Sequence, residues 1–393
     1  MDLRERLRAQ AGQRHAAGLD RTRRMHGARR GAAAVCDGAA LVNFCGNDYL
    51  GFAQHPAVIA AFRAAAAEYG VGSAGSALVS GYFSAHRALE EQAAALFGYE
   101  AALYAGSGYL ANLAVLTALL DGGALCVQDK RNHACLIDGA RFSGAVLKRY
   151  PHADLTGAER ALADTAQNLR MLVSDGVFSM DGDAADIAGL ARIAARHDAT
   201  LMIDDAHGVG VLGATGLGSL QAAGLNANDV PILVVPAGKA LGGQGALVLS
   251  NREVIAHLVA TARPYLFSTA PAPAMAAALS QSLRLLETEP AHHAALQANI
   301  RQFTALAAQA GLPLLPSHTA IQPLLAGGNE RAMRWSEALR AHGFWIGAIR
   351  PPTVPAGSAR LRITLTALHT PAQLEALVET VHGLVEDDDG PAH

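Results

Sequence analysis

The feature that most constrains the fold is a repeated alternation of short apolar runs with amphipathic segments between residues 100 and 250. Apolar runs of four to six residues are too short for buried helices and fit strands that are covered on both faces. Helical segments between most of them predict a mainly parallel sheet with helices on both sides, which is the α/β class. The predicted strands are residues 101–104, 124–128, 145–150, 170–174, 200–203, 232–235 and 246–249.

Polar or glycine-rich segments follow five of these predicted strands. In open sheets of this class, ligands bind outside the carboxyl ends of the strands. We therefore expect a functional site at that edge, built from residues that are distant in the sequence. The segments are residues 105–112, 129–133, 175–183 and 204–208, together with Lys239.

A single lysine, Lys239, stands between the apolar run 232–235 and a run rich in glycine. Glycines let the backbone approach a flat or bulky group closely. A partly desolvated lysine has a depressed pKa and a nucleophilic amine, as a Schiff-base lysine requires. Taken alone, the stretch is equally compatible with a surface lysine on a glycine-rich turn.

Together, the residues at this edge describe a site for pyridoxal 5′-phosphate. Lys239 can form an imine, Asp204 can hold a protonated ring nitrogen, and His207 can point into the same pocket. His133 offers a flat ring for stacking. The turn at residues 106–112 opens a helix, whose free N–H groups and positive dipole end suit a phosphate.

Each candidate also has a purely structural interpretation. Asp204 and Asp205 are compatible with a helix N-cap pair, and His207 with a buried core histidine. His133 is compatible with an ordinary neighbour of an N-cap, and Ser179 with the cap of a turn. A metal site at this edge is disfavoured, because no third ligand stands at suitable spacing.

Several motifs over essentially the whole chain resemble the α-oxoamine synthase family of fold-type I pyridoxal-phosphate enzymes. With the pattern of elements, this resemblance implies an N-terminal arm at residues 1–45, a large cofactor-binding domain at 46–282 and a smaller α+β domain at 283–393. The motifs are Asn47-Asp48-Tyr49-Leu50-Gly51, Val79-Ser80-Gly81-Tyr82, Ser107-Gly108-Tyr109, Gly176-Val177-Phe178-Ser179-Met180-Asp181-Gly182, Asp204-Asp205-Ala206-His207-Gly208 and Gly238-Lys239.

The resemblance implies a role for each cofactor residue. Lys239 carries the cofactor as a Schiff base and moves the α-proton of the substrate. Asp204 pairs with the ring nitrogen, His207 pairs with the ring hydroxyl, and His133 stacks on the ring. The remaining cofactor contacts are Ser107, Gly108, Tyr109 and Ser179.

The same resemblance implies substrate contacts and a second subunit. Arg362 is the expected carboxylate anchor, because a guanidinium binds a carboxylate with two parallel hydrogen bonds. The active site of the family forms between two subunits, so we expect a homodimer in which residues 267–269 reach the cofactor phosphate of the neighbour. The expected substrate contacts are Arg21, Asn47, His133, Thr353 and Arg362.

Residues 348–357, followed by Arg360 and Arg362, are most similar to the branch that condenses L-alanine with a pimeloyl thioester and releases CO2. Pimeloyl-CoA is the expected donor, and a pimeloyl group on a carrier protein is the alternative. Sibling activities use glycine with acetyl- or succinyl-CoA, or serine with palmitoyl-CoA. A non-catalytic partner subunit on the same fold is a further alternative, although such a chain would not need Lys239.

One position departs from the family. Three residues before the Schiff-base lysine the family usually has a threonine whose hydroxyl helps to bind the phosphate, whereas this chain has Pro236. Proline has neither a hydroxyl nor an N–H donor. We expect either weaker cofactor binding or compensation by Ser268 and Thr269.

The composition excludes several classes of function. A net charge of −3 gives no reason to expect nucleic acid or an anionic membrane as a partner. Four cysteines without a Cys-x-x-Cys pair predict a reduced, cytoplasmic chain, and Cys135 reads as a packed residue rather than a nucleophile. The N-terminus has no apolar leader, and no run reaches transmembrane length. We expect the acidic residues 386–390 to be frayed.

Overall fold

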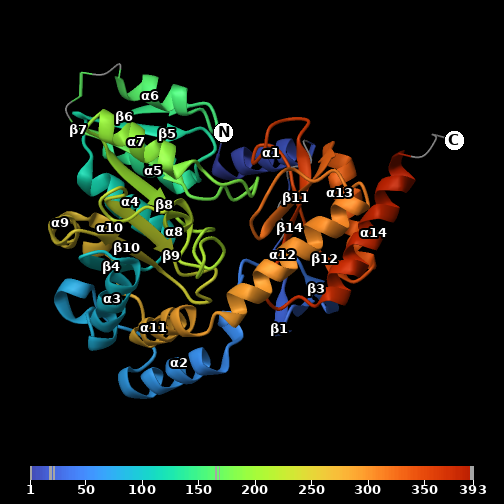
Figure 1. Ribbon diagram of the computed structural model, residues 1–393, viewed down its shortest axis with the longest axis horizontal. Helices are drawn as coiled ribbons and strands as arrows, with labels where there is room; N and C mark the ends of the chain where they lie inside the picture. The colour runs from blue at the N-terminus through green and yellow to red at the C-terminus, as the bar shows by residue number, and fades with distance from the viewer. Residues whose placement is uncertain (1, 17–19, 21–22, 164–165, 168, 390–393) are drawn as a thin grey trace.

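The computed structural model describes residues 2–16, 20, 23–163, 166–167 and 169–389. Its centre is a seven-stranded sheet in the order β4-β10-β9-β8-β7-β5-β6 (Figure 1). All seven strands predicted from the apolar runs form. Only β10 runs antiparallel to its neighbours, so the sheet is mainly parallel as expected. The strands are β4 (Ala101–Ala105), β5 (Ala124–Asp129), β6 (Val146–Tyr150), β7 (Leu169–Asp175), β8 (Thr200–Asp204), β9 (Ile232–Pro236) and β10 (Ala246–Ser250).

Successive strand residues pack into different cores, because side chains alternate between the two faces of a sheet. Leu125 and Val127 of β5 pack into one cluster, and Cys126 between them packs into the other. Residues of α4, α5 and α9 complete the cluster around Cys126, and residues of α3, α7 and α11 complete the opposite one. Both faces are therefore covered, which explains the continuous apolar runs.

Helices surround the sheet at the positions that the sequence indicates. Pro56 starts α2, where a proline is favoured because the first helical N–H needs no partner. The helices and turns of this part are η1 (Phe52–Gln54), α2 (Pro56–Tyr69), the π-helical turn η2 (Ala77–Gly81), α3 (Ser84–Phe97), α4 (Gly108–Leu119), α5 (Ala134–Ser143), α6 (Leu155–Ala163), α7 (Ile187–Arg196), α8 (Ser219–Ala223), α9 (Arg252–Thr261), α10 (Arg263–Leu266) and α11 (Pro273–Thr288). None of the described helices is long and apolar enough to cross a membrane.

The C-terminal part is a three-stranded antiparallel sheet, in the order β11-β14-β13, with long helices. Residues 344–349 do not form one continuous strand. β12 and β13 lie on either side of Ile346 and join different sheets. The elements are α12 (Ala291–Gln309), β11 (Ile321–Gly327), α13 (Asn329–Ala341), β12 (Phe344–Trp345), β13 (Gly347–Ile349), β14 (Ala359–Thr364) and α14 (Pro371–Asp389).

The N-terminal segment joins this C-terminal part. The exposed helix α1 (Leu3–Ala16) precedes β1 (His26–Arg30), β2 (Ala33–Cys36) and β3 (Ala39–Asn43). β3 pairs in parallel with β12, with Val42 opposite Phe344, so the blue N-terminal strands lie beside the orange C-terminal elements in Figure 1. The domain boundaries expected at residues 45 and 282 remain predictions.

The acidic C-terminal segment is helical through Asp389, so the expectation that it frays is wrong for residues 386–389, and Gly390 lies outside the described residues. Asp388 accepts hydrogen bonds from Arg334 Nη2 at 3.1 Å and from Trp335 Nε1 at 2.8 Å. These contacts to α13 hold the last described turn of α14, and they depend on residues more than fifty positions away.

Candidate active site

A cavity of about 550 Å³ lies at the carboxyl ends of β7, β8 and β9, at the edge that the sequence indicates. Ten of the candidates lie in its wall, although they come from segments far apart in the chain. Arg21 lies outside the described residues, and Thr353 is exposed and does not line this cavity. The lining candidates are Asn47, Ser107, Gly108, Tyr109, His133, Ser179, Asp204, His207, Lys239 and Arg362.

Lys239 follows β9 in a tight turn that runs to Gly245. The turn needs glycine at Gly242, which has φ +67° and whose added Cβ would clash with the backbone of Ala53. The half-buried Lys239 faces Asp204 and Asp175. Burial lowers the pKa of Lys239 below 10.5, although the two carboxyl groups oppose this shift. A larger fraction of neutral, nucleophilic amine is therefore present near neutral pH.

Asp204 is the last residue of β8 and is 4% exposed. Its Oδ1 accepts the N–H of Ala206 at 3.0 Å, and its Oδ2 accepts Asn112 Nδ2 at 2.5 Å. Two neutral donors thus hold this carboxylate at the cavity wall. Such a carboxylate suits a positively charged ring nitrogen, because a buried charge is costly without a partner.

His207 is almost fully buried and contacts a tyrosine that lies far away in the sequence. Its Nδ1 lies 2.5 Å from the hydroxyl of Tyr49. Burial lowers the pKa of His207 well below 6.5, and the positive charge of Lys239 adds to this effect. The ring is therefore neutral at physiological pH.

His133 both caps α5 and borders the cavity. Its backbone N–H donates to Asp175 Oδ2 at 2.7 Å, and its Nδ1 accepts from the N–H of Cys135 at 3.3 Å. The N-cap interpretation and the site interpretation therefore apply to the same residue. Burial lowers the pKa of His133, so its ring is neutral. Burial also raises the pKa of the Cys135 thiol to about 12, which fits a packed residue rather than a nucleophile.

The turn between β4 and α4 has the geometry of an anion site. Ser107 caps α4, since its Oγ accepts the N–H of Leu110 at 3.2 Å. The N–H groups in the first turn of a helix lack intrahelical acceptors and suit a phosphate. Pro236 packs on this turn, because a Cβ added to Gly108 would lie 3.0 Å from the proline Cγ.

Arg362 brings a buried positive charge to the same cavity, with 8% of its surface exposed. Its Nε donates to the backbone oxygen of Ser179 at 2.6 Å, and its Nη1 donates to Thr364 Oγ1 at 2.9 Å. Its two terminal nitrogens lie 3.2 and 3.3 Å from Asn47 Oδ1. The described residues that accept hydrogen bonds from Arg362 are all uncharged. The positive charge of its guanidinium is therefore available to an anionic ligand.

Sequence reasoning assigned no individual role to three residues that shape this site. Asn112 holds Asp204, Tyr49 contacts His207, and Asp175 holds the backbone of His133. Burial raises the pKa of Asp175 well above 3.8, and the nearby Asp204 adds to the shift. A polar side chain within the apolar helix α4 was the available signal for Asn112. Asp175 carried the signal of an acidic residue at a strand end.

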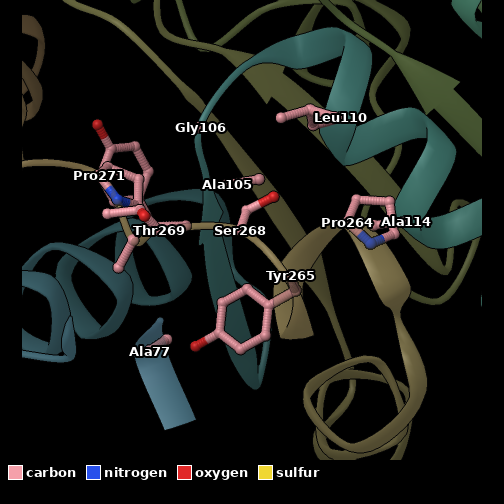
Figure 2. Close-up of a pocket in the computed structure, with 12 residues that line it drawn as sticks. Ala77, Ala105, Gly106, Leu110, Ala114, Pro264, Tyr265, Ser268, Thr269 and Pro271 are labelled. Carbon is pink, nitrogen blue, oxygen red and sulfur yellow. The ribbon is translucent and has the colours of Figure 1, made fainter. Parts of the chain in front are cut away.

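Ser268 and Thr269 do not line the active-site cavity of their own chain. They line a separate cavity of about 40 Å³ with Gly106 and Leu110, close to the turn between β4 and α4 (Figure 2). Phe267 beside them is 71% exposed. Whether this segment reaches a neighbouring subunit's cofactor stays a prediction.

Comparisons with known proteins agree with this geometry. The chain matches the family model Aminotransferase class I and II over residues 39–381. An 8-amino-7-oxononanoate synthase from Stenotrophomonas maltophilia is 50% identical over 97% of this chain and 93% of the relative. An 8-amino-7-oxononanoate synthase from Xanthomonas campestris is 47% identical over 97% of this chain and 95% of the relative.

Solved structures share the fold over nearly the whole chain. A structure of SPT with its PLP internal aldimine has a TM-score of 0.94 and 26% identity, covering 98% of this chain and 99% of that one. A serine palmitoyltransferase from Sphingomonas wittichii has a TM-score of 0.93 and 27% identity over the same shares. An 8-amino-7-oxononanoate synthase from Francisella tularensis has a TM-score of 0.78 and 28% identity, covering 88% of this chain and 98% of that one.

The cavity residues and these relatives agree on pyridoxal 5′-phosphate as the cofactor. The fold is that of the fold-type I enzymes. The chain therefore belongs to the aminotransferase class I and II family and, within it, to the branch of the 8-amino-7-oxononanoate synthases.

Proposed function

We propose that this chain condenses L-alanine with a pimeloyl thioester, releasing CO2 and the free thiol carrier, to form 8-amino-7-oxononanoate for biotin biosynthesis. The observation that carries the proposal is that Lys239, Asp204 and Arg362 line one cavity. The carbon count agrees with the name of the relatives' product. Three carbons of alanine and seven of the pimeloyl group, less the one lost as CO2, give a nine-carbon acid.

The cofactor bound in this cavity would supply an electron sink for the carbanion that forms at the α-carbon of the amino acid. In this proposal, Asp204 keeps the ring nitrogen protonated, with Asn112 and the N–H of Ala206 holding its carboxylate in place. The neutral ring of His207 would pair with the hydroxyl of the cofactor, and His133 would stack on the cofactor ring. The lowered pKa of Lys239 suits an amine that takes the α-proton and later returns it.

Substrate binding is assigned to Arg362 and Asn47, which line the same cavity. Arg362 binds the carboxylate of a substrate, because the residues that accept its hydrogen bonds are uncharged. Its terminal nitrogens contact the side-chain oxygen of Asn47, the second assigned substrate contact. The cofactor phosphate is assigned to the first turn of α4, with Ser107, Gly108 and Tyr109, and to Ser179. Thr353 and Arg21 are assigned to substrate binding by family resemblance alone.

We also propose that the enzyme is a cytoplasmic homodimer with a shared active site. The segment before η2 and the segment after α10 meet, because Ser76 pairs with Thr269 in an antiparallel bridge. Around this pairing, Val79 and Phe267 are 84% and 71% exposed. Large exposed apolar side chains on neighbouring segments are typical of a subunit interface. The molar mass of the cofactor-loaded protein in solution tests this part.

A panel of amino acid and acyl donor pairs tests the substrates. Release of free CoA from the cofactor-loaded enzyme should be fastest with L-alanine and pimeloyl-CoA. Faster release with glycine and acetyl- or succinyl-CoA, or with serine and palmitoyl-CoA, would assign the chain to a sibling activity. Activity only with a carrier-bound pimeloyl group would change the donor but keep the reaction.

The Lys239→Ala variant tests whether the chain is itself the catalyst. The variant should lose activity and the visible absorbance of the lysine-bound cofactor. Full activity in the variant, or no such absorbance in the wild type after cofactor addition, would favour a non-catalytic partner subunit.

A further inference from the structure

A second cluster of metal-ligating side chains lies outside the active-site cavity. The side-chain ligand atoms of His55, Glu289 and His292 all lie within 4.8 Å of one another. Glu289 Oε2 is 3.9 Å from His55 Nε2 and 3.7 Å from His292 Nε2. The cluster joins the N-terminus of α2 to the junction between α11 and α12. At this junction the part with the seven-stranded sheet meets the C-terminal part (Figure 1).

Packing orients both histidine rings toward the carboxylate. Phe52 is fully buried and contacts both rings edge-on, with centroid distances of 6.2 Å to His55 and 5.2 Å to His292. The two histidine rings are 5.4 Å apart at an interplanar angle of 73°. This arrangement restricts the rotamers of both rings, which reduces the entropy that metal binding would cost.

The backbone sets the tautomer of His292. Its Nδ1 lies 3.1 Å from the carbonyl oxygen of Leu50, which can only accept, so Nδ1 carries the proton. The lone pair of a neutral His292 is then on Nε2, the atom that faces Glu289. Histidines that bind metals usually donate their other ring N–H to a carbonyl or carboxylate in this way.

His55 needs one adjustment before it can bind a metal. Its Nδ1 accepts the N–H of Ala57 at 3.3 Å, so the proton of the neutral ring sits on Nε2. Metal binding at Nε2 would move that proton to Nδ1 and break the long bond to Ala57. We therefore expect an affinity below that of a site with all ligands preformed, and an affinity that falls at low pH.

The chain geometry supports the third ligand. Glu289 caps the C-terminus of α11 and His292 lies in the first turn of α12, and the short connection between the two helices places their side chains 3.7 Å apart. The side chain of Glu289 is 48% exposed and free to move, whereas those of His55 and His292 are 19% and 25% exposed. A tetrahedral zinc with bonds of about 2.0–2.1 Å needs ligand atoms roughly 3.3 Å apart. The observed distances to Glu289 are within a small side-chain movement of this value.

We propose that His55, Glu289 and His292 bind a divalent transition metal such as Zn²⁺, with water in the fourth position. Two imidazoles and one carboxylate are ligands that Zn²⁺ and Co²⁺ accept, whereas Mg²⁺ and Ca²⁺ prefer oxygen. The metal would brace α2 against the α11–α12 junction. This proposal does not depend on the proposed reaction.

The test uses the cofactor-loaded protein without an affinity tag, stripped of metal by a chelator that is then removed. Calorimetric titration with Zn²⁺ should show one site per chain that disappears in His55→Gln and in His292→Gln. The matched control is His293→Gln, the neighbouring histidine on α12, whose Nε2 contacts the carbonyl of Val211 instead. This control should keep the site.

Two further readouts separate binding from folding. Co²⁺ should give the visible absorbance of a four-coordinate ion in the wild type and in the control only. Zn²⁺ should raise the thermal midpoint of the wild type but not that of Glu289→Gln, which keeps the shape of the side chain. The proposal is wrong if the wild type binds no Zn²⁺ at 1 mM, a concentration on the order of the weakest useful sites. It is equally wrong if His55→Gln, His292→Gln and Glu289→Gln, shown by circular dichroism to be folded, bind Zn²⁺ as the wild type does.

Discussion

His152 is a charged histidine that braces the loop carrying Ser179, and its removal gives a prediction with a definite pH dependence. Its Nδ1 lies 3.1 and 3.2 Å from the carboxylate oxygens of Asp129, and its Nε2 lies 2.7 Å from Asp183 Oδ2. The ring also packs edge-on against Phe178, with centroids 4.5 Å apart. The histidine thus links the end of β5 to the far end of the loop after β7.

The size of the effect follows from the charge of the ring. Burial opposes that charge, but the hydrogen bonds that the ring donates to the carboxylates of Asp129 and Asp183 outweigh burial and raise the pKa of His152 to about 9. A rise from 6.5 corresponds to at most about 3.4 kcal/mol, since one pKa unit is about 1.36 kcal/mol. The side chains of His152 and Asp183 are 18% and 31% exposed, so solvent screening reduces the expected contribution to roughly 2 kcal/mol.

The sign of the pH dependence is fixed by the direction of the shift. Because the pKa is higher in the folded than in the unfolded chain, the stabilisation is complete below about pH 6.5 and disappears as the pH rises through about 9. We therefore expect His152→Gln to lower the free energy of unfolding by roughly 2 kcal/mol at pH 6 and by much less at pH 10.

Urea unfolding of the wild type and the variant at both pH values measures this difference. Other groups titrate in both proteins. Only the change with pH in the difference between their free energies of unfolding therefore reports on His152. The matched control is His257→Gln, an exposed histidine that contacts the carbonyl of Ala118. A stability difference for His152→Gln that is the same at pH 6 and pH 10 would refute the assignment of a positive charge to this ring.

Three further substitutions test the active-site turn and its supports. Asn112→Ala removes the hydrogen-bond donor to Asp204 Oδ2. A hydrogen bond to a charged group contributes about 1.5–3 kcal/mol, so the cofactor should bind at least about tenfold more weakly. A titration that follows the visible absorbance of the cofactor measures this change. Pro236→Thr should tighten cofactor binding by roughly three- to tenfold in the same titration, and unchanged binding would show that the new hydroxyl meets no phosphate. Gly242→Ala places a Cβ at φ +67° against the backbone of Ala53. We expect the free energy of unfolding to fall by about 3 kcal/mol or more, which lowers the thermal midpoint. An unchanged midpoint would refute the tight-turn argument.

The central sheet could be predicted from the sequence because its signals are local. Each strand is a short apolar run, and most of the cofactor candidates lie at or just after a strand end. The carboxyl edge therefore brings Asp204 and Lys239 together without further information. The helix that starts at Pro56 has a local signal of the same kind. Apolar pattern and strand-end position therefore account for both the fold class and most of the cavity wall.

The remaining features depend on pairings that leave no local pattern. β3 pairs with β12 across about 300 residues, and the divided strand around Ile346 follows from this second partner. Tyr49 meets His207 across 158 positions, and Asn112 meets Asp204 across 92. The local sequence around Tyr49 is that of an ordinary turn, and the polar Asn112 within the apolar helix α4 does not indicate which residue it contacts. Their contacts become visible only when the chain is folded.

Pro236 shows how the fold tolerates a change that affects the chemistry of the site. The residue ends β9 opposite Ala246, one position before the turn in which the N–H of Ala237 bonds to Gly245. A proline at a strand end costs little in pairing, and its ring instead packs on Gly108. The architecture of the turn is therefore kept while one potential phosphate donor is lost. If the phosphate binds at the first turn of α4 as proposed, Ser179 or the Ser268 and Thr269 segment of a second subunit would supply the compensating donor.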